Sequence, residues 1–142
     1  MWRDGWFRLA LAAGPLYWLV HGLLIQAPTD LTWPLRQPAA LLLLVVVYPV
    51  LEEIVFRQLV QYQLLGRLLR YRCCGISAAN LAASTAFAAT HALMRADIGS
   101  LVVFFPSLLF GFFRDRHRQL RSPIVLHSVY NAGYVWLFYH PA

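Results

Sequence analysis

Apolar residues gather along this chain in long segments that are separated by short polar stretches rich in arginine. The segments run roughly over 7–26, 38–66, 76–94, 98–113 and 122–140. About 20 helical residues, rising 1.5 Å each, cross a bilayer core of about 30 Å. The pattern therefore predicts an all-α, polytopic membrane helix bundle with about five transmembrane helices. The segment 98–113 is short, and its Pro106 and Gly111 predict a kinked or partly buried helix.

The composition supports a membrane protein, because 60% of the 142 residues are hydrophobic and only 13% are charged. The length suits a single domain over 1–142, with its chemistry in a core of about 38–140. Basic residues precede the first apolar segment, as in a signal peptide, but no small-residue cleavage site follows it. We expect that segment to remain as the first membrane span.

The formal charge of +6 comes with 12 basic residues that are all arginine. If the five segments cross the membrane in turn, nine of the arginines lie on one side of the membrane. Two arginines, Arg36 and Arg95, lie on the other side. Because basic residues favour cytoplasmic loops, the N-terminus is predicted to be cytoplasmic in a multi-pass protein of the cell membrane. This preference explains the charge better than nucleic-acid binding does. The nine are Arg3, Arg8, Arg67, Arg70, Arg72, Arg114, Arg116, Arg118 and Arg121.

Three ionisable residues interrupt the second apolar segment, namely Glu52, Glu53 and Arg57. A charge at the centre of a membrane helix costs about 2.5 to 3.5 kcal/mol on insertion scales, so such residues need partners and often mark a functional site. Glu53 and Arg57 are four residues apart and share a helix face, with the acid on the N-terminal side. Glu52 lies about 100° around the axis and can face another helix, where it is available for proton exchange.

Two further segments carry polar groups at helical spacing. His91 lies one turn after Phe87 in the third segment, and His127 and Asn131 lie four apart in the last. An imidazole can orient a water molecule, and an asparagine amide can stabilise an oxyanion. Together with a glutamate base, these groups predict a site for hydrolysis, and such a site would need a water-filled cavity.

Other interpretations of the same residues exist. A single histidine or asparagine inside a membrane often makes a hydrogen bond between helices. The pair of glutamates with the arginine could be a structural or partner-binding network in a protein that is not an enzyme, or the proton relay of a transporter. No serine nucleophile motif GxSG or zinc motif HExxH is present to support another class of protease.

The order of these motifs resembles the signature of the CPBP family of intramembrane proteases, which includes CAAX prenyl endopeptidases and bacteriocin-processing or immunity proteins. The resemblance covers residues from about 48 to 135, and its motifs are Glu52-Glu53-x-x-x-Arg57, Phe87-x-x-x-His91 and His127-x-x-x-Asn131. It implies that a multi-pass membrane protein cleaves a membrane-associated protein or peptide substrate within the lipid bilayer.

The resemblance also implies roles for the residues. Glu52 would activate the attacking water, His91 would help to hold it, and His127 with Asn131 would stabilise the oxyanion. Glu53 and Arg57 would support the site. No cofactor is implied, although two histidines and a carboxylate could bind zinc. The small chain also resembles glutamic intramembrane proteases that accompany C-terminal sorting signals, including JDVT-type tails.

Depth in the membrane is a difficulty for this hypothesis. In straight helices, His91 would lie about 15 residues from the cytoplasmic end of its segment, and His127 only about five. The two histidines share a water only if the loop 114–121 and the start of the last helix extend beyond the membrane, or if the third helix begins deeper.

Overall fold

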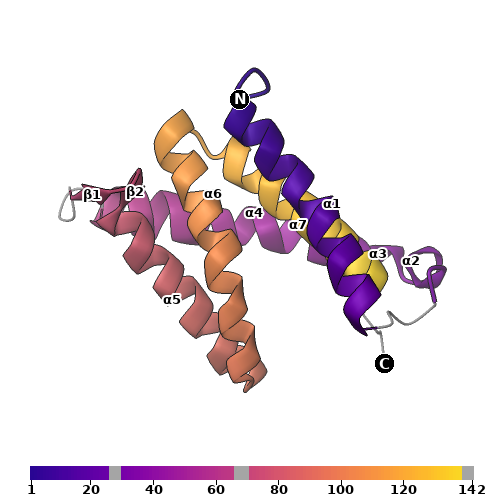
Figure 1. The fold of residues 1–142 in the computed structure, drawn as a ribbon. Coiled ribbons are helices and arrows are strands. Elements are labelled where there is room, and N and C mark those ends of the chain that lie inside the picture. The colour runs from indigo at the N-terminus through magenta and orange to yellow at the C-terminus, as the bar shows by residue number, and fades with distance from the viewer. Residues whose placement is uncertain (26–29, 66–70, 139–142) are drawn as a thin grey trace. The chain divides into compact units, whose positions relative to one another are not determined.

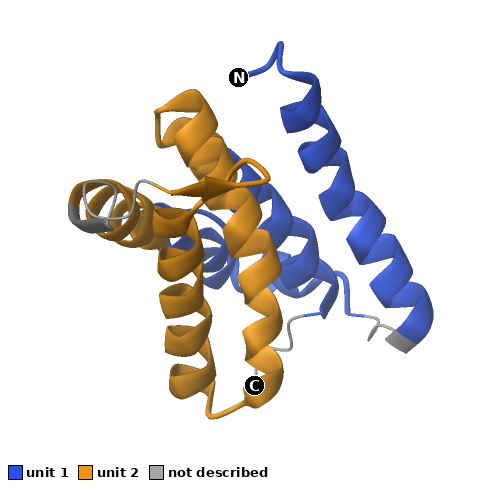
Figure 2. Cartoon of the chain, turned by 60° about the vertical axis from the view of Figure 1, so that its left-hand side comes forward, with its two compact units in different colours: residues 1–50, 125–142 blue, residues 51–124 orange. Residues whose placement is uncertain are grey.

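The computed structural model describes residues 1–25, 30–65 and 71–138. It is all-α apart from one short hairpin, and it divides into two compact units (Figure 2). Unit 1 comprises Met1–Val50 and Val125–Ala142, and unit 2 comprises Leu51–Ile124. Within the described ranges, three helical stretches are long and apolar enough to cross a membrane, namely Gly5–Leu24, Pro38–Gln63 and Ile98–His117.

Unit 1 contains helix α1 (Gly5–Ile25) and most of helix α7 (Arg121–Phe138), which lie side by side (Figure 1). Two hydrogen bonds join them: the Trp18 indole nitrogen donates to the Tyr130 carbonyl oxygen at 3.2 Å, and the Tyr130 hydroxyl donates to the Ala10 carbonyl oxygen at 2.7 Å. A Cβ atom on Gly133 would overlap the Trp18 indole. A residue without a side chain therefore allows this close helix packing.

The second apolar segment forms one helical stretch that changes between α and π geometry. It follows the short helix α2 (Trp33–Arg36) and consists of α3 (Pro38–Leu42), the π-helix η1 (Leu43–Val47), α4 (Tyr48–Glu53) and the π-helix η2 (Ile54–Leu65). Pro49 has no backbone N–H, and its ring crowds the carbonyl four residues earlier. That carbonyl belongs to a residue of η1, and the wider π turns of η1 make room for the proline ring.

Unit 2 contains the second half of this stretch, a hairpin and a pair of helices. Strands β1 (Arg72–Cys73) and β2 (Ile76–Ser77) pair antiparallel, and α5 (Ala78–Arg95) follows. The 3-10 helix η3 (Ile98–Val103) then leads into α6 (Phe104–His117). Helix α5 packs against η2, η3 and α6, and Figure 1 shows α5 beside α6. The buried apolar side chains of this unit are Ala79, Ala83, Phe87, Ala88, Phe110 and Phe113.

Specific caps set the ends of these helices. The Ser77 hydroxyl accepts a hydrogen bond from the Asn80 N–H at 3.0 Å and begins α5, and Ala96 ends it in the left-handed conformation at φ 50°. Arg118, at φ 54°, ends α6 in the same way. Most of the predicted loop 114–121 is therefore helical, because α6 continues to His117 and α7 begins at Arg121. Pro106 lies in the first turn of α6, where proline is tolerated.

Candidate functional site

Four of the six predicted site residues come together in unit 2. Glu52 and Glu53 end α4, Arg57 follows in η2, and His91 lies near the end of α5. His127 and Asn131 belong to α7 in unit 1, and their surroundings are described within that unit.

The two adjacent glutamates have different environments. The Glu53 and Arg57 side chains are both 0% exposed and form an ion pair, with Arg57 Nε 3.1 Å from Glu53 Oε2. The Glu52 side chain keeps 29% of its surface exposed. This division matches the helix phase predicted from the sequence, in which only Glu53 shares a face with Arg57. Of the two carboxylates, only Glu52 is partly open to solvent.

Arg57 uses each of its five N–H donors. Besides Glu53, its guanidinium donates to the Gln61 side-chain oxygen at 3.3 Å, to the Ser84 hydroxyl at 3.4 Å, and to the hydroxyl and carbonyl oxygens of Ser107 at 2.5 and 2.9 Å. A buried charge needs such complete pairing, because an unmatched donor would carry its full desolvation cost. Arg57 thereby joins η2, α5 and α6.

His91 faces Glu52 across a short gap, with its Nε2 atom 3.9 Å from Glu52 Oε1. Its other ring nitrogen, Nδ1, lies 3.0 Å from the Phe87 carbonyl oxygen. A carbonyl oxygen only accepts hydrogen bonds, so Nδ1 donates and, in a neutral ring, Nε2 is left as an acceptor. Two acceptors at this distance do not bond directly, but one water molecule can lie against both and donate to them.

Aromatic rings hold the imidazole of His91 in place. The Phe87 ring packs against it, with ring centroids 4.3 Å apart, and the Phe56 ring contacts Phe87 edge-on at 5.0 Å. Phe87 is buried, so its backbone carbonyl and its ring restrain His91 from two directions. The imidazole is thus orientated before any substrate binds, which is what catalysis by positioning requires.

In unit 1, Asn131 takes part in a contact between helices. Its Nδ2 atom donates to the Leu44 carbonyl oxygen in η1 at 3.0 Å. This is the helix-bridging role that a single intramembrane asparagine often has, and it leaves the second N–H of the amide for another acceptor. His127 lies one turn earlier on α7 and is 5% exposed.

Sequence reasoning missed the polar residues that surround Arg57. Gln61, Asn80, Ser84 and Ser107 are buried and form one hydrogen-bonded network, in which the Ser84 hydroxyl donates to the Asn80 side-chain oxygen at 3.0 Å. The available signal was helical spacing, since Asn80, Ser84, Phe87 and His91 follow each other by three or four residues and so share one face of α5.

A metal site is not evident among these side chains. Within the described ranges, no three histidine, cysteine, aspartate or glutamate side chains form a group that could hold a metal ion. The hypothesis that two histidines and a carboxylate bind zinc is therefore supported only by the types of these residues.

Comparison with known protein families fits this geometry. A family model described as type II CAAX prenyl endopeptidase Rce1-like matches residues 34–133, which include all six predicted site residues. The chain belongs to this family. Its members are peptidases, so membership together with the apolar helices indicates a multi-pass membrane protease that acts on a protein substrate. No curated protein and no solved structure matches the chain.

Proposed function

We propose that this protein is an intramembrane endopeptidase in which Glu52 is the general base. The observation that carries the proposal is the difference between the two glutamates: Glu53 is enclosed with Arg57, whereas the partly exposed Glu52 faces His91 at 3.9 Å. A carboxylate that water can reach, and that can share a bridging water with a neighbouring imidazole, is suited to take a proton from that water. Membership of a peptidase family supports the same chemistry.

The reaction follows from these positions. A water held between Glu52 and His91 gives a proton to Glu52 while its oxygen attacks the carbonyl carbon of the peptide bond. The negative charge develops on the former carbonyl oxygen, and His127 and the second N–H of Asn131 are the donors assigned to it. Glu52 then passes its proton to the leaving nitrogen, and the C–N bond breaks to give a carboxylic acid and an amine, after which the acid gives its proton to the amine. Glu53 and Arg57 position Glu52 by holding its helix.

The substrate we propose is a membrane-associated protein, with the C-terminal sorting tail of a secreted protein as the finer assignment. The supporting arguments are the membrane-spanning helices and the resemblance to proteases that accompany JDVT-type tails. A transmembrane tail would enter from the bilayer, where the exposed apolar surface of the second span lies.

Co-expression with candidate tail proteins tests the proposal. We expect wild type to cleave the tail and Glu52→Gln, which keeps the shape and removes the base, to lose at least about a hundredfold in rate. Asp97→Asn is the matched control, because it makes the same chemical change in a loop outside the site and keeps a good helix cap. The control should cleave like wild type.

Two results would overturn the proposal. If Glu52→Gln is destabilised as much as it is inactivated, the cluster is a structural network and not a catalytic one. If a chelator abolishes cleavage and zinc restores it, the general-base mechanism without metal is wrong.

A further inference from the structure

The tip of the hairpin in unit 2 carries the only two cysteines of the chain, Cys73 and Cys74. Both thiols are exposed and unbridged. The Cys73 thiol donates a weak hydrogen bond to the Cys74 sulfur, and the two Sγ atoms are 3.8 Å apart. Neither the peptidase chemistry nor the family assignment uses these thiols. Two sulfur atoms that lie this close together can bind one thiophilic metal ion at the same time.

The hairpin holds the backbone of the two cysteines in place. Cys73 pairs with Ile76, and Arg72 pairs with Ser77, in the antiparallel ladder of β1 and β2. The Ser77 hydroxyl also donates to Asp115 Oδ2 of α6 at 2.6 Å. The two thiols therefore belong to a turn that is fixed by its own ladder and by a contact with α6.

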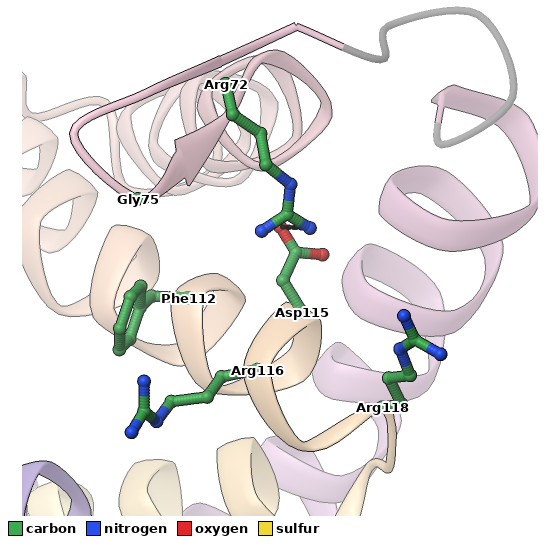
Figure 3. A pocket seen from close by; sticks show the side chains of 6 residues that line it. All are labelled: Arg72, Gly75, Phe112, Asp115, Arg116 and Arg118. Atoms are coloured by element: carbon green, nitrogen blue, oxygen red, sulfur yellow. Dashed lines mark ion pairs between the residues drawn. The ribbon is translucent and has the colours of Figure 1, made fainter.

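A pocket of about 480 Å³ between the hairpin and the last turn of α6 shows further contacts of this kind (Figure 3). It is lined by Arg72, Gly75, Phe112, Asp115, Arg116 and Arg118. Two of its arginines have partners within the lining. Arg72 Nη2 lies 3.6 Å from Asp115 Oδ2, and the Arg116 guanidinium lies over the Phe112 ring, 6.0 Å from its centroid. The ion pair of Arg72 thus also joins the hairpin to α6.

Cys74 has a backbone conformation that cysteine rarely adopts. Its φ angle is 52° and that of Gly75 is 83°, so both central residues of this two-residue turn are left-handed. Such a turn favours asparagine, aspartate or glycine, because a Cβ atom is crowded in the left-handed region. The turn by itself does not explain a cysteine at this position, and residues in such sparsely populated conformations cluster at ligand-binding sites.

The positions of the two cysteines favour a metal ion over a disulfide. Disulfides usually join Cα atoms that are about 4.4 to 6.8 Å apart, whereas adjacent Cα atoms are only about 3.8 Å apart. A tetrahedral zinc ion has Zn–S bonds of about 2.3 Å, so two of its sulfur ligands lie about 3.8 Å from each other. The two Sγ atoms already have this separation, 3.8 Å. Such an ion can bind both sulfurs without a change in the backbone.

We propose that Cys73 and Cys74 together bind one thiophilic divalent metal ion of the zinc and cadmium type. Two metal–sulfur bonds form and both thiols release their protons, so one M²⁺ ion and two thiols give a neutral bis-thiolate complex and two protons. Within the described ranges, no group of three histidine, cysteine, aspartate or glutamate side chains could hold a metal ion, so water completes the tetrahedron. The inference is independent of the proposed protease activity.

Cadmium titration of the full chain in detergent tests this site. The protein is reduced, free of metal and without a histidine tag, and the signal is the ultraviolet absorption of cadmium–thiolate bonds, which only these two cysteines can form. We expect one cadmium ion per chain, with displacement by zinc. Magnesium should not displace it, because magnesium prefers oxygen ligands.

Single variants separate binding from folding. Cys73→Ser and Cys74→Asn should each weaken cadmium binding about a hundredfold or more, since even the loss of an outer-shell partner of a ligand costs about 10- to 100-fold. Asparagine suits the left-handed turn, so Cys74→Asn should keep or raise the melting temperature of the metal-free protein. Glu52→Gln is the control, because it removes a carboxylate outside the hairpin, and it should bind cadmium as wild type does.

Each of three results would refute the site. If either cysteine variant keeps the affinity of wild type, one thiol is sufficient and the pair does not act as a chelate. If wild type shows no cadmium–thiolate absorption, the thiols do not bind the ion. If Glu52→Gln loses cadmium, the ion is held at the glutamates and not at the hairpin.

Discussion

The adjacent residues Glu52 and Glu53 have different surroundings because a helix turns about 100° from one residue to the next. Glu53 points into the buried network of unit 2, whereas Glu52 points towards His91 and remains partly exposed. The ion pair between Glu53 and Arg57 holds this arrangement, and its two charges can be buried only as a pair.

At this scale we expect Arg57→Leu to destabilise the protein by about 3 to 5 kcal/mol, because it leaves the Glu53 carboxylate buried without its cation. Replacing both residues, in Glu53→Leu/Arg57→Leu, should restore a large part of that stability. The measurement is the midpoint of unfolding in a denaturing detergent series. If the double variant is no more stable than the single variant, the uncompensated charge is not the cause of the loss.

Arg36→Leu provides a matched control for this experiment. Arg36 also pairs with an acid, Asp30, and together with the Thr32 hydroxyl it lowers the pKa of Asp30 to about 2. Both side chains of this pair are about half exposed, and solvent screens such pairs. The control should therefore change the unfolding midpoint far less than Arg57→Leu does.

Helix packing in unit 2 depends on small residues where polar side chains cross between helices. Gly111 of α6 faces the carboxamides of Asn80 and Gln61, and a Cβ atom on it would overlap the Asn80 side-chain oxygen. The Gln61 amide also donates to the Gly111 carbonyl oxygen at 3.0 Å. The network around Arg57 can form only because α6 approaches so closely here.

Gly111→Ala therefore has two opposing effects. At a solvent-exposed helix position, replacing glycine by alanine would raise the free energy of unfolding by about 1 kcal/mol. Adding a methyl group to a tightly packed contact typically lowers that free energy by about 1 to 3 kcal/mol. Since the displaced groups are hydrogen-bonded carboxamides, we expect a net loss of stability and a lower melting temperature. Gly5→Ala is the control, because no atom lies within 4 Å of its added Cβ. A stabilised Gly111→Ala variant would contradict this account of the contact.

The whole molecule belongs to a peptidase family, and its apolar helices indicate a multi-pass membrane protein. Its arginines predict the orientation in the membrane. Nine arginines on one predicted side of the membrane predict that the N-terminus and the hairpin lie in the cytoplasm.

Cys73 and Cys74 allow a direct test of orientation, because both are exposed, unbridged thiols in the hairpin. A maleimide that cannot cross membranes should label them in inverted vesicles but not in intact spheroplasts. Cys73→Ser/Cys74→Ser should remove the signal in both preparations, which shows that these thiols carry the label. Labelling of spheroplasts and not of inverted vesicles would reverse the topology.

Much of this protein follows from its sequence. Long apolar runs must be helical in lipid, where each backbone polar group needs an internal partner, so the sequence predicted helices in all five apolar segments. Within the described residues, three helical stretches rather than five are long and apolar enough to cross a membrane. The spacing of Glu53 and Arg57 likewise predicted their pairing, because four residues return to one helix face. The catalytic roles of Glu52, His91, His127 and Asn131 remain predictions.

Other features arise only when distant segments meet. The sequence places Ser107 and Ser84 50 and 27 residues from Arg57, and nothing in their local pattern marks them as its partners. The pocket at Arg72 and Arg118 is also formed by the hairpin and the end of α6, which are separate in the chain. Local periodicity determines the direction in which a side chain points, whereas tertiary packing determines what it meets, because the crossing of helices depends on side-chain volumes along the whole contact.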